Sequence, residues 1–332
     1  MKKNLIALAV LAASGASMAQ STVTLYGIVD VLVGSKTIEN KNNVVAPSLT
    51  QTQMDTGTVN GTRWGLRGSE DLGGGLKAVF DLQSGFDLST GASQQGGSLF
   101  GRQAFVGFQG GFGTIKFGRV ITPFFETESA HDVMLASSLS AQSNVMRTSN
   151  NWSSAGNNGT VAAFEKSSIA GYTLRGNNAF RYDTPNLSGF AGSIAYSMNE
   201  KAQSTAPQGN TANPAVISAS LAYAAGPVGA LLAYQKETPY QPSGVGAVGT
   251  VYAGTNASDR NFLRLSGQYD FGTIVAKAGY GRADNVNFKQ GATTNEYQFG
   301  ADYKLSPTIL LTGGFATSTD DAIGAIPEVK RT

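Results

Sequence analysis

Apolar and polar side chains alternate residue by residue along much of this chain, most clearly between residues 172 and 182. The even positions there carry Tyr172, Leu174, Phe180 and Tyr182. The odd positions carry Arg175, Asn177 and Arg181. A repeat of two places the two sets on opposite faces of an extended segment, so the pattern predicts a β-strand. Such a strand fits either a soluble sheet with a core on one face or a wall between lipid and water.

The same alternation recurs along the chain and predicts about thirteen strands, so the fold class is all-β. We expect the strands at about 22–34, 61–69, 75–86, 99–109, 113–119, 172–182, 190–199, 216–224, 230–236, 261–269, 273–282, 295–304 and 308–317.

Short and long connections between these strands follow each other without a break. The short ones, rich in Gly, Pro and Asp, are typical of hairpin turns and lie at 70–75, 110–113, 183–189, 224–229, 270–272 and 305–307. The long ones lie at 35–60, 87–98, 120–171, 200–215, 237–260 and 283–294. In an antiparallel up-and-down sheet this order places all short turns at one end. Transmembrane β-barrels of bacterial outer membranes have that asymmetry, and a soluble sandwich does not require it.

One face of the predicted strands suits lipid. Four strands end in tyrosine just before a short turn, namely at Tyr182, Tyr223, Tyr269 and Tyr303. Aromatic side chains at a common height favour the boundary between lipid and water. The rest of this face is apolar without being bulky, as at Leu25, Leu66 and Ala276. We therefore expect a barrel whose outer surface faces a membrane.

The opposite face carries charge and must contact water, because unpaired charges are very costly in a dry core. The alternation assigns nine basic residues to it: Arg63, Arg67, Lys77, Arg102, Lys116, Arg175, Arg181, Arg264 and Lys277. It assigns four acidic residues to it: Asp30, Asp81, Glu296 and Asp302. In a barrel this face is the lumen, and the excess of basic groups predicts a preference for anions.

Composition and the N-terminus add the cellular context. Only 14% of the 332 residues are charged, 42 are Gly and none is Cys. Lys2 and Lys3, the apolar run Leu5–Ala13 and the small residues before Gln20 are typical of a signal peptide over residues 1–19. Without that segment 22 basic residues face 22 acidic ones, so no basic field indicates nucleic acid. We expect export across an inner membrane.

The sequence offers little for catalysis or cofactor binding. The one histidine, His131, is followed by Asp132 with Ser129 and Ser137 nearby, but no Gly-x-Ser-x-Gly motif surrounds a serine. No phosphate-binding loop and no spacing of metal ligands occurs in the sequence. We predict no enzyme activity, no catalytic residues, no cofactor and no metal.

Three segments resemble general outer-membrane porins of Gram-negative bacteria, particularly the β-proteobacterial trimeric type. They are Thr22–Asp30, Thr62–Ala78 and Gly101–Arg119. The last includes Gly101-Arg102-Gln103-Ala104-Phe105-Val106-Gly107-Phe108. The resemblance runs from the signal peptide to about residue 318.

The resemblance implies a sixteen-stranded barrel, a homotrimer, and a constriction loop at about 120–147 that folds inward. It implies wall arginines at the constriction, for which Arg63, Arg102 and Arg175 are the candidates, with Arg181 or Arg147 as further ones. It implies acidic groups on the loop, for which Glu126, Glu128 and Asp132 are the candidates. The family's commonest acidic loop motif, Pro-Glu-Phe-Gly, does not occur, so the choice among these acids stays open.

The C-terminus departs from the family pattern. Such porins usually end on a strand whose last residue is Phe, whereas this chain ends Ile326-Pro327-Glu328-Val329-Lys330-Arg331-Thr332. Thirteen strands also fall short of sixteen. We therefore expect residues 20–332 to form a porin domain that is truncated at its C-terminus.

The sequence thus predicts an outer-membrane channel for passive diffusion of small hydrophilic solutes and inorganic ions, with a leaning toward anions. Its expected partners are outer-membrane lipid, lipopolysaccharide and two further copies of the chain. A substrate-specific channel remains the main alternative, and an exported adhesin or structural β-protein is a weaker one. Saturable block of conductance by one solute would favour the substrate-specific channel.

Overall fold

The computed structural model describes residues 22–39, 48–57, 60–127, 130–132, 172–198, 215–238, 258–285, 290–291, 293–321 and 329–331. Fourteen strands form one antiparallel sheet in which each strand pairs with its neighbour in the order β1, β4 to β16. The strands are β1 (Thr22–Ile28), β4 (Arg63–Gly73), β5 (Leu76–Gly85), β6 (Gln103–Gly110), β7 (Gly113–Ile121), β8 (Arg175–Asp183), β9 (Phe190–Ser197), β10 (Ala215–Ala225), β11 (Val228–Thr238), β12 (Arg260–Asp270), β13 (Ile274–Asp284), β14 (Thr293–Ser306), β15 (Ile309–Asp320) and β16 (Val329–Arg331).

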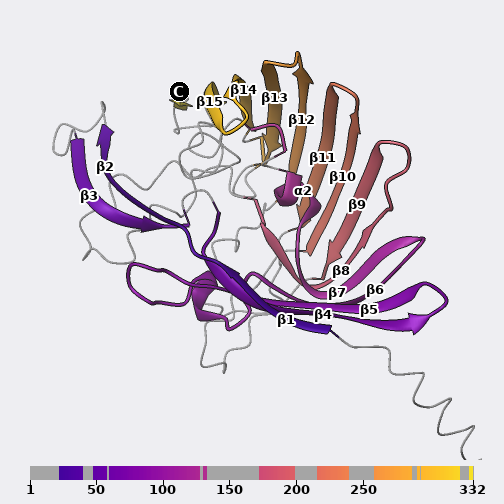
Figure 1. Ribbon diagram of the computed structural model, residues 1–332. Helices are drawn as coiled ribbons and strands as arrows, with labels where there is room; N and C mark the ends of the chain where they lie inside the picture. The colour runs from indigo at the N-terminus through magenta and orange to yellow at the C-terminus, as the bar shows by residue number, and fades with distance from the viewer. Residues whose placement is uncertain are drawn as a thin grey trace, which may run out of the picture.

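The sheet is strongly curved. In Figure 1, β1 and β4 to β7 run across the bottom and β9 to β15 rise at a steep angle to them, with β8 near the bend. The short helix α2 (Pro123–Glu126) lies on the concave side. No helix among the described residues is long and apolar enough to cross a membrane.

Each of the thirteen expected strands has a counterpart in the large sheet, and β16 extends the sheet beyond the expected end at 317. One prediction at the N-terminus was wrong. The expected strand 22–34 is interrupted at residues 29 and 30, and the expected loop 35–60 contains a strand. There β2 (Val31–Glu39) and β3 (Ser48–Thr56) form a separate antiparallel pair. In Figure 1 this pair projects away from the large sheet.

Tight turns join the strands at one end, as the sequence predicts. Gly226 between β10 and β11 has φ 56°, and Gly272 between β12 and β13 has φ 93°. L-residues with a side chain rarely adopt such values, which explains glycine at these corners. The Gly272 N–H also donates to Asp270 Oδ1 at 2.7 Å, an Asx turn that fixes the corner.

The two faces of the sheet differ as the alternation predicts. On β11 the inward residues Leu231 and Gln235 are buried, whereas the outward residues Leu232 and Tyr234 are 46% and 40% exposed. Outward apolar residues elsewhere are also exposed, including Leu25 at 70% and Phe299 at 60%, Leu265, Ile194, Val106 and Phe315. A soluble protein would bury an apolar surface this extensive, so the outer face is suited to lipid.

Aromatic residues gather at the end of the sheet that carries the short turns. The rings of Phe190 and Tyr223 lie 4.6 Å apart, and those of Tyr269 and Phe271 lie 4.5 Å apart. The Tyr182 hydroxyl donates to the carbonyl oxygen of Phe112 in the neighbouring turn at 2.6 Å. Each ring thus has an apolar body on the outer face near turns that carry polar groups, which is the arrangement expected of an interfacial girdle.

A bulge between β7 and β8 reverses the pattern that first suggested a strand. The register shifts between Gly118 and Val120, and Asn178 on the facing strand has φ 44°. A bulge adds one residue to one strand and so moves the following side chains to the other face. Tyr172, which lies beyond this bulge and just outside β8, is in the inner cluster at 8% exposure, while Phe180 is exposed at 42%. The prediction that Tyr172 and Leu174 share the outer face with Phe180 was wrong.

Candidate functional site

Two predicted arginines converge on one glycine at the start of β4. Arg63 Nη1 donates to the carbonyl oxygen of Gly61 at 2.8 Å. The guanidinium of Arg102 packs against the Cα of the same glycine so closely that a β-carbon at Gly61 would meet it at 2.6 Å. Arg102 Nε also donates to Gln83 Oε1 at 2.7 Å, which is a neutral acceptor. The two positive charges therefore stand together.

A third predicted arginine joins them. Arg175 Nε donates to the backbone carbonyl of Arg102 at 3.0 Å, and its guanidinium stacks over the ring of Phe125 at 5.4 Å. The structure thus links Arg63, Arg102 and Arg175 through Gly61 and the Arg102 backbone, and Arg175 also contacts Phe125 of α2.

The sequence analysis missed a fourth member, Arg119. Its Nε donates to the carbonyl oxygen of Gly101 at 2.8 Å, next to Arg102, and its Nη1 donates to Asn177 Oδ1. Arg119 ends the segment Gly101–Arg119 that carries the porin resemblance, but strict alternation from Lys116 assigns it to the outer face. It lies opposite the bulge of β8, and Asn177 in that bulge accepts its Nη1. We call Arg63, Arg102, Arg119 and Arg175 the arginine cluster.

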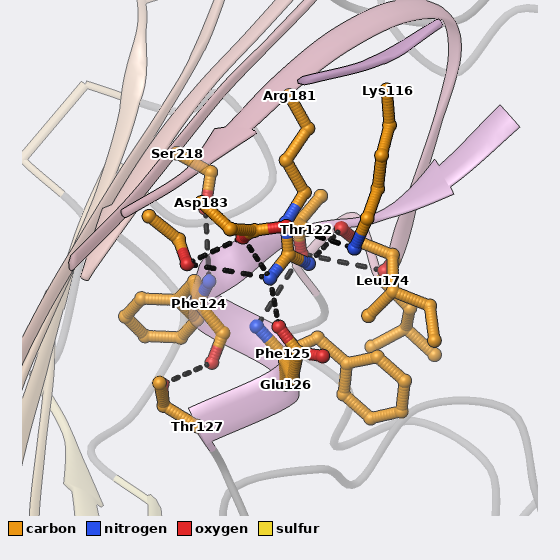
Figure 2. A network of polar contacts seen from close by, with 12 residues as sticks. Lys116, Thr122, Phe124, Phe125, Glu126, Thr127, Leu174, Arg181, Asp183 and Ser218 are labelled. Carbon is orange, nitrogen blue, oxygen red and sulfur yellow. Dashed lines mark hydrogen bonds and ion pairs between the residues drawn. The ribbon is translucent and has the colours of Figure 1, made fainter. Parts of the chain in front are cut away.

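The predicted constriction loop enters the concave face through α2. Thr122 caps this helix, because its Oγ1 accepts the N–H of Phe125 at 3.3 Å, and Pro123 occupies the first turn. The N–H of Phe124 donates to Ser218 Oγ on β10 at 3.0 Å. Figure 2 shows these contacts around α2. The predicted loop extends to 147, and within it residues 120–127 and 130–132 are described.

The fourth predicted constriction arginine, Arg181, bonds to carboxylates. Its guanidinium bonds to Glu126 on α2 and to Asp183 Oδ1 at 2.7 Å, and Lys116 Nζ lies 2.8 Å from Asp183 Oδ2 (Figure 2). The loop acid Glu126 therefore bonds to an arginine of the wall. Its partner Arg181 is buried, however, and neutralised by two carboxylates, so it serves as an anchor for α2.

Aromatic packing holds α2 against the opposite strands. The Phe124 ring lies 4.8 Å from Tyr172 and 6.0 Å from Phe262 of β12. Arg264, predicted to face the lumen, stacks its guanidinium over Phe124 at 4.7 Å. The stacking covers most of Arg264, which is 2% exposed. This charge faces an aromatic cluster rather than open water, and cation–π attraction stabilises it there.

Next to the aromatic cluster of Phe124, Tyr172 and Phe262 lies a buried ion pair that the sequence analysis also missed. Arg260 of β12 bonds to Glu237 of β11, and Glu237 is fully buried. Glu237 Oε1 accepts the side chain of Gln235 at 2.7 Å and the backbone N–H of Thr173 at 2.6 Å. Both members stood near the ends of expected strands, where alternation alone assigned neither to the lumen.

Residues 130–132 dock farther along the same strands. His131 Nδ1 lies 2.9 Å from Ser266 Oγ, and the backbone carbonyl of Asp132 accepts Lys277 Nζ at 3.1 Å. Lys277 also pairs with Asp302 at 2.8 Å. Burial lowers the pKa of His131 below its ordinary value, the charge of Lys277 acts in the same direction, and the bond with Ser266 opposes them. His131 therefore rests in its neutral form against the wall.

The remaining predicted residues lie in different parts of the chain. Arg67 and Asp81 face each other across β4 and β5, and Lys77 is exposed near the turn that joins these strands. Asp30 supports the corner between β1 and β2, where its Oδ2 accepts the N–H of Asn60 at 2.6 Å. Glu296 is buried against Gly281 on the inner face. Glu128 and Arg147 lie outside the described residues.

The described residues contain no cluster of three His, Cys, Asp or Glu side chains that could hold a metal ion. What the concave face does contain is a curved strand wall, a group of arginines and a loop packed against that wall.

The family model described as Gram-negative porin matches residues 6–322. This chain belongs to the Gram-negative porin family. The outer membrane porin protein of Bordetella pertussis is 33% identical over 96% of this chain and 77% of its own length. Outer membrane porin protein 32 of Delftia acidovorans is 34% identical over 91% of this chain and 75% of its own length. As a member of the family, this porin is an outer-membrane channel for passive diffusion of small hydrophilic solutes.

A solved structure supports the fold of this porin. The anion-selective porin from Comamonas acidovorans superposes with a TM-score of 0.65 at 24% sequence identity, and the match covers 91% of this chain and 80% of that one. At this identity the match concerns the fold, and the fold and family indicate a channel rather than an enzyme.

Proposed function

We propose that this porin passes small anions in preference to cations and that the arginine cluster sets this preference. The observation that carries the proposal is the convergence of Arg63 and Arg102 on Gly61, which brings two guanidinium groups to one point of the wall. Fixed guanidinium groups keep their charge at any relevant pH and attract anions into a water-filled lumen. The matching solved porin is described as anion-selective, which agrees with this reading.

The loop that carries the predicted acidic residues belongs to the same proposal. We propose that Glu126, through Arg181, and Asp132, through its backbone carbonyl on Lys277, anchor this loop to the wall and so set the lumen width. The resemblance assigns Glu128 to the same loop. Glu126 supports this role because it bonds to Arg181 while its side chain stays 51% exposed. Of the other predicted lumen groups, we propose that Arg67 and Lys77 add to the positive potential of the wall, whereas Lys116, Arg264 and Lys277 serve packing.

We further propose that the functional unit is a homotrimer embedded in outer-membrane lipid and lipopolysaccharide. The support is the outer face, where apolar side chains such as Leu25 and Phe299 are more than half exposed. A trimer would cover part of that surface and lipid the remainder.

We also propose that this porin catalyses no reaction. His131 and Ser266 form a hydrogen bond that resembles a base beside a nucleophile, but they are only 8% and 7% exposed. A substrate would need access to that serine and an oxyanion site beside it. The pair is better explained as a contact that docks residues 130–132.

The test is the reversal potential of the refolded mature chain in a planar bilayer under a KCl gradient. The double variant Arg63→Gln/Arg102→Gln should lower the chloride-to-potassium permeability ratio severalfold, because it removes the two positive charges that converge on Gly61. The control Lys277→Gln/Asp302→Asn removes a cation together with its paired anion and should leave the ratio unchanged. Equal effects of the two double variants would contradict the proposal, as would a wild-type preference for potassium.

A further inference from the structure

A cavity of about 300 Å³ opens on the inner face of β1, β4, β5 and β6, outside the arginine cluster. Its lining includes Thr24, Arg67, Ser69, Asp81 and Phe105. Arg67 follows Arg63 by four residues on the same strand face, which is about 13 Å at the usual rise per residue. The cavity thus lies along the lumen from the cluster, toward the end with the short turns.

Two opposite charges stand side by side in this cavity. Arg67 and Asp81 are direct partners in the β4–β5 ladder. Within the described residues neither forms an ion pair, and the guanidinium of Arg67 instead lies over the ring of Tyr26 at 5.0 Å. Arg67 is exposed, so its N–H groups are available to a solute. Asp81 is half-buried and has one carboxylate oxygen engaged.

A chain of hydrogen bonds fixes the Asp81 carboxylate. The Tyr26 hydroxyl donates to Asp81 Oδ1 at 2.6 Å, and Gln83 Nε2 donates to the Tyr26 oxygen at 2.9 Å. Gln83 in turn accepts Arg102 Nε at 2.7 Å. Gln83 therefore connects Arg102 of the cluster, through Tyr26, to the Asp81 carboxylate of the cavity. A carboxylate held this way costs little to organise when a ligand arrives.

We propose that this cavity is a second solute site, and that it takes small zwitterions of the amino-acid class. The carboxylate of the solute would bind Arg67 and its ammonium group would bind Asp81, while Phe105 provides an apolar floor for its side chain. A site for simple anions would gain nothing from Asp81, which repels them. The inference rests on the proposed function only in that solutes reach the cavity through the lumen.

The test is a saturation-transfer NMR titration of L-alanine with the mature chain refolded in detergent micelles. Acetate and ethylammonium serve as probes that carry one charge each. L-Alanine should bind about tenfold more tightly than either, because two charge-assisted contacts replace one. Arg67→Gln and Asp81→Asn should each weaken its binding about tenfold. Lys77→Gln removes a charge from the same wall outside the cavity and should leave binding unchanged.

Two results would overturn the site. One is acetate binding as tightly as L-alanine with no effect of Asp81→Asn, which would indicate attraction of anions only. The other is the lack of a saturable signal in the wild type while circular dichroism shows folded β-structure. Micelle binding does not depend on conductance, so a chain that binds L-alanine without forming chloride-selective channels would contradict the proposed function and not this site.

Discussion

The basic side chains of the inner face behave differently on its two sides. On β7 to β14, Lys116 and Arg181 pair with Asp183, Arg260 pairs with Glu237, and Lys277 pairs with Asp302. On β4 and β5 no ion pair engages Arg63, Arg67 or Lys77 anywhere in the described part of the chain. One side uses its cations to bind its own acids and the loop. The other side presents them to the lumen.

This difference shows that a count of lumen-facing charges is a poor guide to selectivity. The count of nine basic against four acidic groups treats all positions alike, yet the field that a solute meets comes from charges without a counter-ion. Lys116, Arg181 and Lys277 contribute little to that field because carboxylates lie within 3 Å of each. The paired side is also where α2 docks, so the ion pairs of β7 to β14 serve stability, while the cations of β4 and β5 contribute to the field in the lumen.

The largest expected effect comes from breaking the buried pair on the docked side. Arg260→Leu leaves Glu237 buried without its counter-charge, and such a loss typically costs about 3 kcal/mol or more. We expect the urea midpoint of the refolded chain in detergent to fall accordingly. The same substitution at an exposed cation of the other side, Arg67→Leu, should change the midpoint little.

A double variant tests the cause of that loss. Arg260→Leu/Glu237→Leu removes both charges and should recover much of the stability, because no uncompensated charge remains. If the double variant is no more stable than Arg260→Leu, the loss arises from packing and the ion pair is not the cause.

A smaller effect should follow when the anchor of α2 is removed. Arg181→Gln frees Glu126, while Asp183 keeps its contact with Lys116. The lost charge-assisted bonds contribute about 1 kcal/mol to the free energy of docking of α2. Their loss should therefore increase the population of molecules in which α2 is undocked about fivefold. Limited digestion with chymotrypsin, followed by mass spectrometry at Phe124 and Phe125, measures this. Arg63→Gln, on the unpaired side, is the matched control, and equal cleavage in both variants would argue against the division between sides.

Much of the fold could be predicted because strand alternation and turn composition are local properties. The hairpin glycines and the outward apolar residues follow from them directly. The bulge at Gly118 and Asn178 could not be predicted, since a single extra residue is decided by how two strands meet. It lies beside the contact between Arg119 and Asn177, and Tyr172 beyond it packs against Phe124. The strand β3 was missed because its polar sequence, Ser48–Thr56, resembles a loop.

The candidate site was predictable in its residue types and less so in its pairing. Arg63, Arg102 and Arg175 came from motifs and alternation, and the structure places them together. Which arginine meets Glu126 depends on where residue 123 turns inward. That turn is set by contacts between residues far apart in sequence, such as Phe124 with Ser218. Sequence patterns carry no direct record of such contacts.

The smallest expected effect concerns pH and the second contact of the docked side. His131 is neutral in the folded chain because burial and Lys277 lower its pKa, while Ser266, Asp132 and the Lys277–Asp302 pair surround it. The unfolded chain takes up the proton near pH 6.5, so stability is full above that pH and declines as pH falls toward the lowered pKa. The variant His131→Gln cannot take up this proton on unfolding. Its free energy of unfolding, measured with urea, should therefore depend less on pH between about pH 7 and 5.5 than that of the wild type. Parallel profiles for the two proteins would mean that carboxylates, and not His131, govern the acid sensitivity of the docked side.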